Sequence, residues 1–308
     1  MKRIIISSAA LLVTLMISAQ QMPISENYFM DKYSLSPSYA GHFNPATIFT
    51  GFRSDWSGIK GGPKTLRLAY SDMMTPNAGY GGRIIYDKAG IFDQLYVLGT
   101  YSYSVKLTGD HRVLLALSAG IYNNKINFTD YYNDPNYNLD PALTQQNVRS
   151  KLKFMSDFSV LYLFKGLEAG IMFANINFGD AKYKEVDVTY KPLANYQVHA
   201  AYSYNLTDRW MINPLIYMRG GKYIKSQIGI GSRIVYQNNL WAGITYRDPS
   251  IFGIGLGANI AGGIRFSYNF NFETSVAMNI YNSHEIAIGI DLGKLIKRHP
   301  KPEADSGV

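Results

Sequence analysis

The chain has 308 residues, with 30 Lys and Arg against 22 Asp and Glu, 14% aromatic residues and 17% charged residues. This charged fraction is well below the roughly 25% of average soluble domains, and a chain with so much apolar surface is not intrinsically disordered. The absence of cysteine excludes a disulfide scaffold, a thiolate zinc site and a cysteine nucleophile. Two classes remain: a soluble all-β protein and a membrane β-barrel.

Residues 1–19 carry the pattern of a secretory signal peptide. Basic residues at positions 2 and 3 precede an apolar run over 4–17, and Ser18-Ala19 offers small residues for cleavage. The run is shorter than the about 20 apolar residues that a membrane-spanning helix needs. We therefore expect export of the chain and removal of residues 1–19. The modest positive charge of the remainder, without a long basic run, does not predict nucleic-acid binding.

The segment 20–45 shows no clear periodicity, and the sequence leaves open whether it lies in the periplasm or in the lumen of a barrel. From residue 46 onward, apolar and polar residues alternate with period two, most clearly over 264–273 and 285–292. A strand sorts such residues onto two faces, whereas a helix would scatter them. The alternation predicts fourteen strands, most of about 8 to 12 residues, that begin near Ala46, Thr65, Tyr80, Leu95, Arg112, Lys153, Leu167, Tyr196, Arg209, Ser226, Asn239, Phe252, Gly263 and His284.

The connections between these strands alternate in length. Tight turns are predicted at one end and longer polar loops at the other, namely the turns 107–110, 165–166, 206–208, 237–238 and 261–262 and the loops 123–150, 177–195 and 274–283. This parity is typical of an outer-membrane β-barrel, whose short turns face the periplasm. The sequence therefore predicts an all-β, antiparallel transmembrane barrel over 46–292 in the outer membrane, followed by a basic periplasmic tail over 293–308.

Polar side chains that alternate with apolar neighbours are predicted to line the lumen, among them Arg67, Arg233 and Arg265. One role for them is mutual pairing that fills and rigidifies the interior. The other is a charged pore lining that selects solutes. The alternation is compatible with both roles.

The polar loop 129–140 contains Tyr131, Tyr132 and Tyr137 among several Asp and Asn residues. Its spacing does not fit an EF-hand, and tyrosines supply contact area at small entropic cost, so we expect a protein-contact surface.

The sequence carries no specific motif for metal binding, nucleotide binding or catalysis. The five histidines lack metal-ligand spacing. The stretch 58–65 has Pro63 where a P-loop has glycine, and a predicted strand follows it instead of a helix. We therefore expect no metal, no cofactor and no catalytic residue. A barrel hydrolase, the remaining enzymatic alternative, would need an inward Ser and His within hydrogen-bond reach.

Four stretches, spread from the segment before the first strand to the last strand, carry a family pattern. They are Tyr28–Gly41, Phe52–Thr65 (similar to R-x-Q-W-x-G-x-x-G-x-P-x-T), Leu240–Arg247 and Asn282–Ile286 (like S-H-E-I before a final strand). In these stretches the chain resembles the PorP/SprF family of the Bacteroidetes type IX secretion and gliding system. The residues marked by the resemblance are Trp56, Gly58, Pro63 and Thr65 in the first extracellular loop, and His284 and Glu285 at the start of the last strand.

The resemblance implies a barrel in outer-membrane lipid that is not an enzyme and that binds, localises or anchors an exported type IX substrate, such as a surface adhesin used in gliding motility. It also implies association with a periplasmic OmpA-like peptidoglycan-binding protein. Trp56, Pro63 and the three loop tyrosines are the candidates for partner contact. The alternative function is a passive outer-membrane channel for small or apolar solutes.

Overall fold

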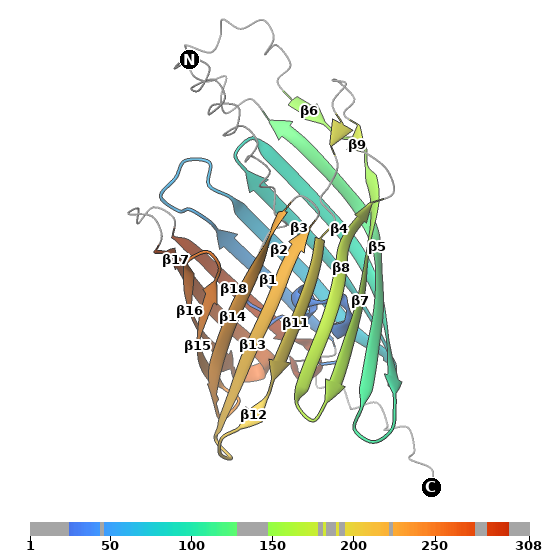
Figure 1. Cartoon of the computed structure of the whole chain (residues 1–308), viewed down its shortest axis with the longest axis vertical. Coiled ribbons are helices and arrows are strands. Elements are labelled where there is room, and N and C mark those ends of the chain that lie inside the picture. The colour runs from blue at the N-terminus through green and yellow to red at the C-terminus, as the bar shows by residue number, and fades with distance from the viewer. Residues whose placement is uncertain are drawn as a thin grey trace, which may run out of the picture.

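A computed structural model describes residues 25–43, 46–127, 147–177, 181–182, 189–190, 195–221, 224–274 and 282–295. Fourteen antiparallel strands close into a single barrel, which confirms the predicted fold (Figure 1). They are β1 (Thr47–Ser54), β2 (Lys64–Thr75), β3 (Ala78–Ala89), β4 (Phe92–Lys106), β5 (Arg112–Asn127), β7 (Lys153–Phe164), β8 (Leu167–Asn177), β11 (Asn195–Tyr202), β13 (Trp210–Gly221), β14 (Ile224–Tyr236), β15 (Leu240–Arg247), β16 (Ile251–Ile260), β17 (Ile264–Glu273) and β18 (Ser283–Asp291).

Each strand pairs with its neighbours in sequence, and the barrel closes where the first strand meets the last. In β1, Arg53 lies opposite Glu285 of β18. On the far side β11 bridges β8 and β13, with Tyr196 opposite Phe173 and Gly220. Every strand begins within three residues of its predicted start. Closure leaves no unpaired edge between the strands of the wall, which is what a sheet in lipid requires.

The strands β4 and β5 are longer than predicted, at 15 and 16 residues. The last five residues of β5, 123–127, are mostly polar, and the sequence placed them in a loop. They nevertheless pair with β4, and the short strand β6 (Asn147–Arg149) pairs with them in turn. Backbone pairing continues past the apolar band here, where the period-two signal ends.

The wall has an apolar outer face and a polar inner face. In β2, Leu66 and Leu68 are 49% and 45% exposed, whereas Thr65 and Arg67 are 1% and 8% exposed. The other strands also expose apolar side chains and bury polar ones, the reverse of a soluble protein. This is the pattern of a barrel whose outer surface contacts lipid.

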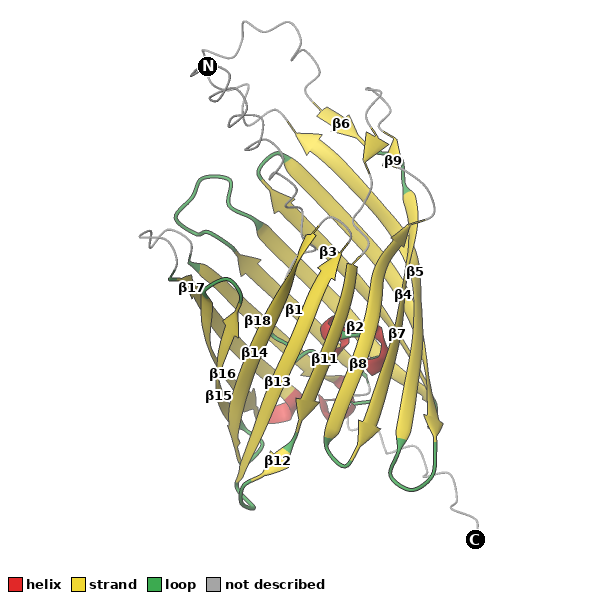
Figure 2. Ribbon diagram, viewed as in Figure 1, coloured by secondary structure: helices red, strands yellow, loops and turns green. Residues whose placement is uncertain are grey.

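The two ends of the barrel differ (Figure 2). At the lower end in this view short turns such as 76–77, 165–166 and 237–239 join the strands. The upper end carries loop 55–63 and the strand ends that flank 128–146 and 178–194. The end with long connections is extracellular, and the end with short turns is periplasmic.

The segment 25–43, which the sequence assigned to periplasm or lumen, lies inside the barrel, and we call it the plug. It contains α2 (Lys32–Leu35) and the 3-10 turn η2 (Pro37–Tyr39), which Figure 2 shows in red within the ring of strands. Its apolar side chains pack on the wall, as Tyr28 does on Tyr217 at 5.0 Å between ring centroids. Within the described ranges, no helix is long and apolar enough to cross a bilayer.

The remaining elements are short. They are β9 (Ala181–Lys182) paired with β10 (Thr189–Tyr190), β12 (Tyr204–Asn205), the 3-10 turn η4 (Ala261–Gly263) and α4 (Leu292–Leu295), which follows β18. The expected signal peptide over 1–19 and the tail beyond residue 295 lie outside the described residues.

Candidate functional site

The plug begins at a buried carboxylate on the last strand. Glu285 of β18, 1% exposed, accepts hydrogen bonds from the Ser25 hydroxyl at 2.6 Å and from the Glu26 backbone N–H at 2.7 Å. Nη1 of Arg53 lies 3.2 Å from the same carboxylate. A buried charge is stable only when it is paired and hydrogen-bonded, and here the plug supplies two of the donors. Glu285 therefore ties the plug to the seam between β1 and β18.

The next two plug residues bind the neighbouring wall. The carboxylate of Glu26 forms an ion pair with Arg247 at 3.0 Å. The side-chain oxygen of Asn27 accepts hydrogen bonds from the Ser267 hydroxyl and, at 2.9 Å, from the Asn269 amide. These contacts fix the start of the plug against β15 and β17.

The far end of the plug meets the opposite wall in a second polar cluster. Lys32 forms an ion pair with Glu168 of β8. The Tyr39 hydroxyl donates to Glu168 at 2.8 Å and lies 3.0 Å from Nε2 of His199. A Cβ at Gly170 would lie 2.4 Å from the His199 ring, so only glycine lets the imidazole occupy this place. The plug is therefore held on both sides of the lumen.

Wall side chains also satisfy the plug's backbone. Gln197 donates to the Leu35 carbonyl at 2.8 Å, and Ser102 donates to the Ala40 carbonyl at 2.7 Å. Buried carbonyls need such partners, because water does not reach them. Hydrogen bonds from the wall thus reach the backbone of the plug at the end of α2 and just after η2.

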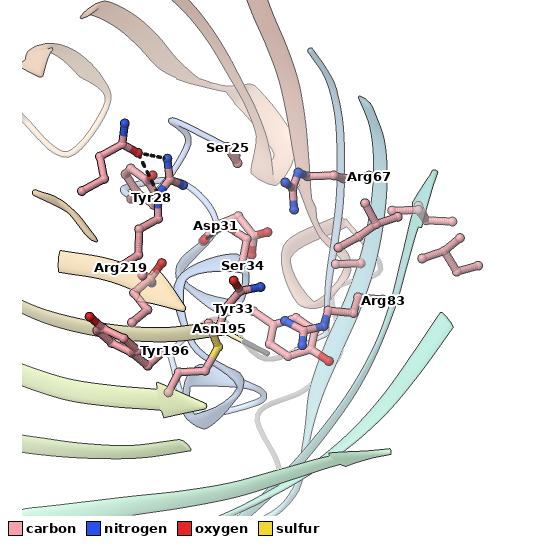
Figure 3. Close-up of a pocket in the computed structure, with 18 of the residues that line it drawn as sticks. Ser25, Tyr28, Asp31, Tyr33, Ser34, Arg67, Arg83, Asn195, Tyr196 and Arg219 are labelled. Atoms are coloured by element: carbon pink, nitrogen blue, oxygen red, sulfur yellow. Dashed lines mark hydrogen bonds between the residues drawn. The ribbon is translucent and has the colours of Figure 1, made fainter. Parts of the chain in front are cut away.

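On the extracellular side of the plug a small cavity of about 80 Å³ remains. Figure 3 shows Asp31 and Tyr33 of the plug between Arg67 and Arg83 of one wall and Tyr196 of the opposite wall. Burial raises the pKa of Asp31 to about 6, although the positive charge of Arg67 opposes the shift. A cavity of this size holds a few water molecules.

The three arginines predicted for the lumen all point inward. Arg67 borders the cavity on the extracellular side. Arg233 donates to the Phe29 carbonyl at 3.1 Å, and Arg265 donates to the Met30 carbonyl at 3.2 Å. The sequence offered mutual pairing or pore lining for them. In the structure, two of them hold the backbone of the plug, a third role that strand periodicity alone does not reveal.

The extracellular loop 55–63 is a compact platform. The Asp55 N–H donates to the Pro63 carbonyl at 2.8 Å, and the Ser57 N–H donates to the Asn282 carbonyl at 2.9 Å, which ties the loop to the start of β18. Trp56, the second residue of the loop, is 44% exposed. This arrangement presents an aromatic side chain to the outside on a hydrogen-bonded loop that also contains Gly58.

Three of the marked residues lie in the wall: Thr65, His284 and Glu285. Thr65 belongs to β2 and not to the loop, because backbone pairing with β1 already begins at position 64; its hydroxyl donates to Asp87 at 2.6 Å inside the barrel. His284 contacts the Tyr268 hydroxyl at 2.7 Å, on the strand face opposite to Glu285. Tyr131, Tyr132 and Tyr137 lie outside the described residues.

Several plug contacts were not found from sequence. Glu26, Lys32 and Tyr39 lie in the aperiodic segment, and their partners Glu168 and His199 lie on distant strands. The only signal was the presence of charged residues in a stretch without a strand or helix period. In the part of the chain that the structure describes, no group of three or more His, Asp or Glu side chains is placed to hold a metal ion.

These features define an outer-membrane β-barrel whose lumen is occupied by its own N-terminal segment. A family model described as type IX secretion system membrane protein PorP/SprF matches residues 17–290, and the chain belongs to this family. The protein is therefore an outer-membrane component associated with type IX secretion. The comparison with curated proteins found no match.

Among solved structures the chain is similar to several barrels. The CymD monoaromatic hydrocarbon channel is 14% identical, with a TM-score of 0.49, over 87% of this chain and 92% of that chain. A Pseudomonas aeruginosa FadL homologue is 8% identical, with a TM-score of 0.49, over 80% and 90%. The Pseudomonas putida toluene transporter TodX is 10% identical, with a TM-score of 0.43, over 87% and 93%.

Proposed function

We propose that this protein retains an exported type IX substrate at the cell surface by binding it through its extracellular face, without catalysing a reaction. The observation that supports this role is the occupied lumen. A barrel whose lumen is crossed by its own segment offers its outer loops for binding, and the plug lies in the path that a solute would take. A surface adhesin of the kind used in gliding is the proposed cargo.

The strength of the plug contacts argues for a closed barrel. Two ion pairs, of Arg247 with Glu26 and of Lys32 with Glu168, join the plug to the wall, and the wall carboxylate Glu285 accepts two further hydrogen bonds from the plug. Breaking one buried pair by removing a partner typically costs about 3–5 kcal/mol. Spontaneous exit of the plug would break several of these contacts at once, so a permanently open channel is disfavoured.

The extracellular face has the features of a contact surface. Trp56 is exposed on a loop that is fixed by backbone hydrogen bonds, and exposed tryptophans are frequent binding hot spots. The three tyrosines of the loop 129–140 would add aromatic contact area on the same face. On the other side of the membrane, we propose that an OmpA-like peptidoglycan-binding protein holds the barrel in place.

A crosslinked pull-down from intact outer membranes, read by mass spectrometry, tests this function. We expect a large secreted protein to be recovered with the wild-type barrel and about tenfold less of it with Trp56→Ala, since loss of a hot spot costs about 1–2 kcal/mol or more. Trp210→Ala is the matched control, because Trp210 is similarly exposed, at 41%, at the periplasmic end. Equal recovery from both variants would contradict the role of the extracellular platform.

The alternative function, a channel, is tested by solute flux. If the plug closes the barrel, the purified wild-type protein in liposomes should pass no small solute, whereas a variant that lacks residues 25–43 should pass it. Rapid flux through the wild-type protein would favour the channel.

A further inference from the structure

A larger cavity lies between the plug and the periplasmic ends of β13–β18. Its volume is about 710 Å³, and residues of the turns 237–239 and 261–263 lie at its mouth. It therefore faces the periplasm, opposite to the platform discussed above. We call this cavity the vestibule; it is lined by Phe29, Arg233, Trp241, Arg265, Asp291 and Lys294, among others.

Basic side chains outnumber acidic ones in the lining of the vestibule, with Lys32, Arg233, Arg265 and Lys294 against Asp291. Lys294 lies 3.8 Å from Asp291, and Lys32, which also borders the cavity, pairs with Glu168. Arg233 and Arg265, by contrast, have no carboxylate within ion-pair distance among the residues that the structure describes. Two guanidinium groups therefore face the cavity without a carboxylate in direct ion-pair contact; Asp31 and Asp291 act on Arg265, and Glu168 acts on Arg233, only at longer range.

These two guanidinium groups are held in fixed positions. Nε of Arg233 donates to Asn213 at 2.8 Å and its Nη1 donates to the Phe29 carbonyl at 3.1 Å. Nη1 of Arg265 donates to the carbonyl of the next plug residue, Met30, at 3.2 Å. Because the two acceptors are consecutive residues, the guanidinium groups lie near each other on the plug. Each group has five N–H donors, so both keep donors that these bonds do not use.

An aromatic wall lies beside them. The Cζ atom of Arg233 is 5.0 Å from the Phe29 ring and 5.9 Å from the Trp241 ring. A Cβ at Gly257 would lie 2.2 Å from Nε1 of Trp241, so the glycine makes room for the indole on the inner face of the wall. Stacking restricts the guanidinium of Arg233 and leaves its edge for hydrogen bonding.

We propose that the vestibule is a binding site for an acidic peptide segment of a periplasmic protein, whose carboxylates Arg233 and Arg265 bind. A planar guanidinium matches the two oxygens of a carboxylate, and such charge-assisted bonds are stronger than those to the plug carbonyls. The lining is mixed: aromatic rings lie next to the amides of Asn238, Asn239 and Asn259, which suits a peptide with backbone groups to satisfy. The cavity volume also falls within the range of about 300–1,000 Å³ that ligand sites occupy. This site is separate from the proposed extracellular function and does not depend on it.

Tetraglutamate peptide is the probe, tetraglutamine is its neutral counterpart, and inorganic phosphate tests a different source of negative charge. Calorimetry on the full-length barrel in detergent should show saturable binding of tetraglutamate that weakens with added salt, and none of tetraglutamine. The double variant R233Q/R265Q should bind at least about 30-fold more weakly. Arg219→Gln is the matched control with unchanged affinity, because Arg219 is a lumenal arginine that lines the cavity on the other side of the plug.

Since both arginines also hold plug carbonyls, the variant R233K/R265K separates binding from plug retention. It keeps the two charges and a donor for each carbonyl but loses the planar double contact, so we expect a retained plug and weaker binding. Wild-type affinity in R233Q/R265Q, or no binding of tetraglutamate to the wild-type protein, would overturn the proposal. Phosphate that binds more tightly than tetraglutamate would overturn the assignment to a peptide.

Discussion

Replacement of Glu285 by glutamine tests whether the plug is held as the structure indicates. The substitution keeps the shape of the side chain and one acceptor oxygen but removes the negative charge. In the wild-type protein the Glu285 carboxylate accepts hydrogen bonds from the Ser25 hydroxyl, the Glu26 N–H and Arg53. Arg53 keeps its ion pair with Asp55 at 2.7 Å, so its guanidinium group is not left unpaired. A hydrogen bond to a charged group contributes about 1.5–3 kcal/mol and a neutral one about 1 kcal/mol. Over the two plug bonds we expect docking of the plug to weaken by about 2–3 kcal/mol.

The chain contains no cysteine, so a single thiol reports on the plug without interference. Ser36 is fully buried in the plug, and Ser36→Cys should react with a maleimide only when the plug leaves its site. The weakening of 2–3 kcal/mol predicts a labelling rate about 30- to 150-fold higher in the Glu285→Gln background.

A matched control is Asp87→Asn, in which a buried lumenal carboxylate bonded to Thr65 of the neighbouring strand is neutralised. It should label at the parent rate. Heat-modifiable migration on gels shows whether the barrel of each variant is folded. If Glu285→Gln formed a folded barrel and still labelled at the parent rate, the plug would not depend on this carboxylate and the reasoning would fail.

Three further results are expected. Gly170→Ala would place a Cβ 2.4 Å from the His199 ring and disturb the contact of His199 with Tyr39. The free energy of unfolding, measured by thermal denaturation, should therefore fall by about 1–3 kcal/mol. Gly99→Ala, with no atom within 4 Å of the new Cβ, should change it little. Burial raises the pKa of Asp31 from 3.8 to about 6, so the docked plug binds a proton that the released plug has lost; docking should be strongest below about pH 4 and weaken as pH rises through 6, by at most about 3 kcal/mol. Labelling of Ser36→Cys from pH 4 to 8, divided at each pH by the labelling rate of the same cysteine in the unfolded chain to remove the pH dependence of the thiolate, measures this trend, and Asp31→Asn should abolish it. Deletion of residues 128–146 should leave barrel assembly intact and lower retention of the exported protein; undiminished retention would exclude that loop as the contact.

Outer-membrane placement and closure have a practical consequence for these experiments. The variants named for the plug change side chains of the plug or of the inner face of the wall, and among them only the control Gly99→Ala adds a methyl group on the outer face. The barrel itself should therefore assemble in every case, because its stability in the membrane depends on strand pairing and on the apolar outer band.

The barrel was determined by the sequence itself. Period-two alternation, tight turns at one end and an apolar outer band are local properties, because each strand faces lipid on one side and the lumen on the other along its whole length. This is why the strand number, the strand starts and the inward direction of Arg67, Arg233 and Arg265 followed from the residues. The polar end of β5 did not, because past the apolar band pairing no longer leaves an alternating pattern.

The place of the plug was decided only by tertiary structure. Segment 25–43 has no period, since its side chains bind different strands one at a time: Glu26 reaches Arg247, Lys32 reaches Glu168 and Tyr39 reaches His199, across up to 221 positions of sequence. These partners are polar residues on the inner face of the wall, but strand alternation does not say what such a residue binds. Closing the barrel brings these distant residues around one short segment, and the need to pair every buried charge and carbonyl then fixes the plug between them.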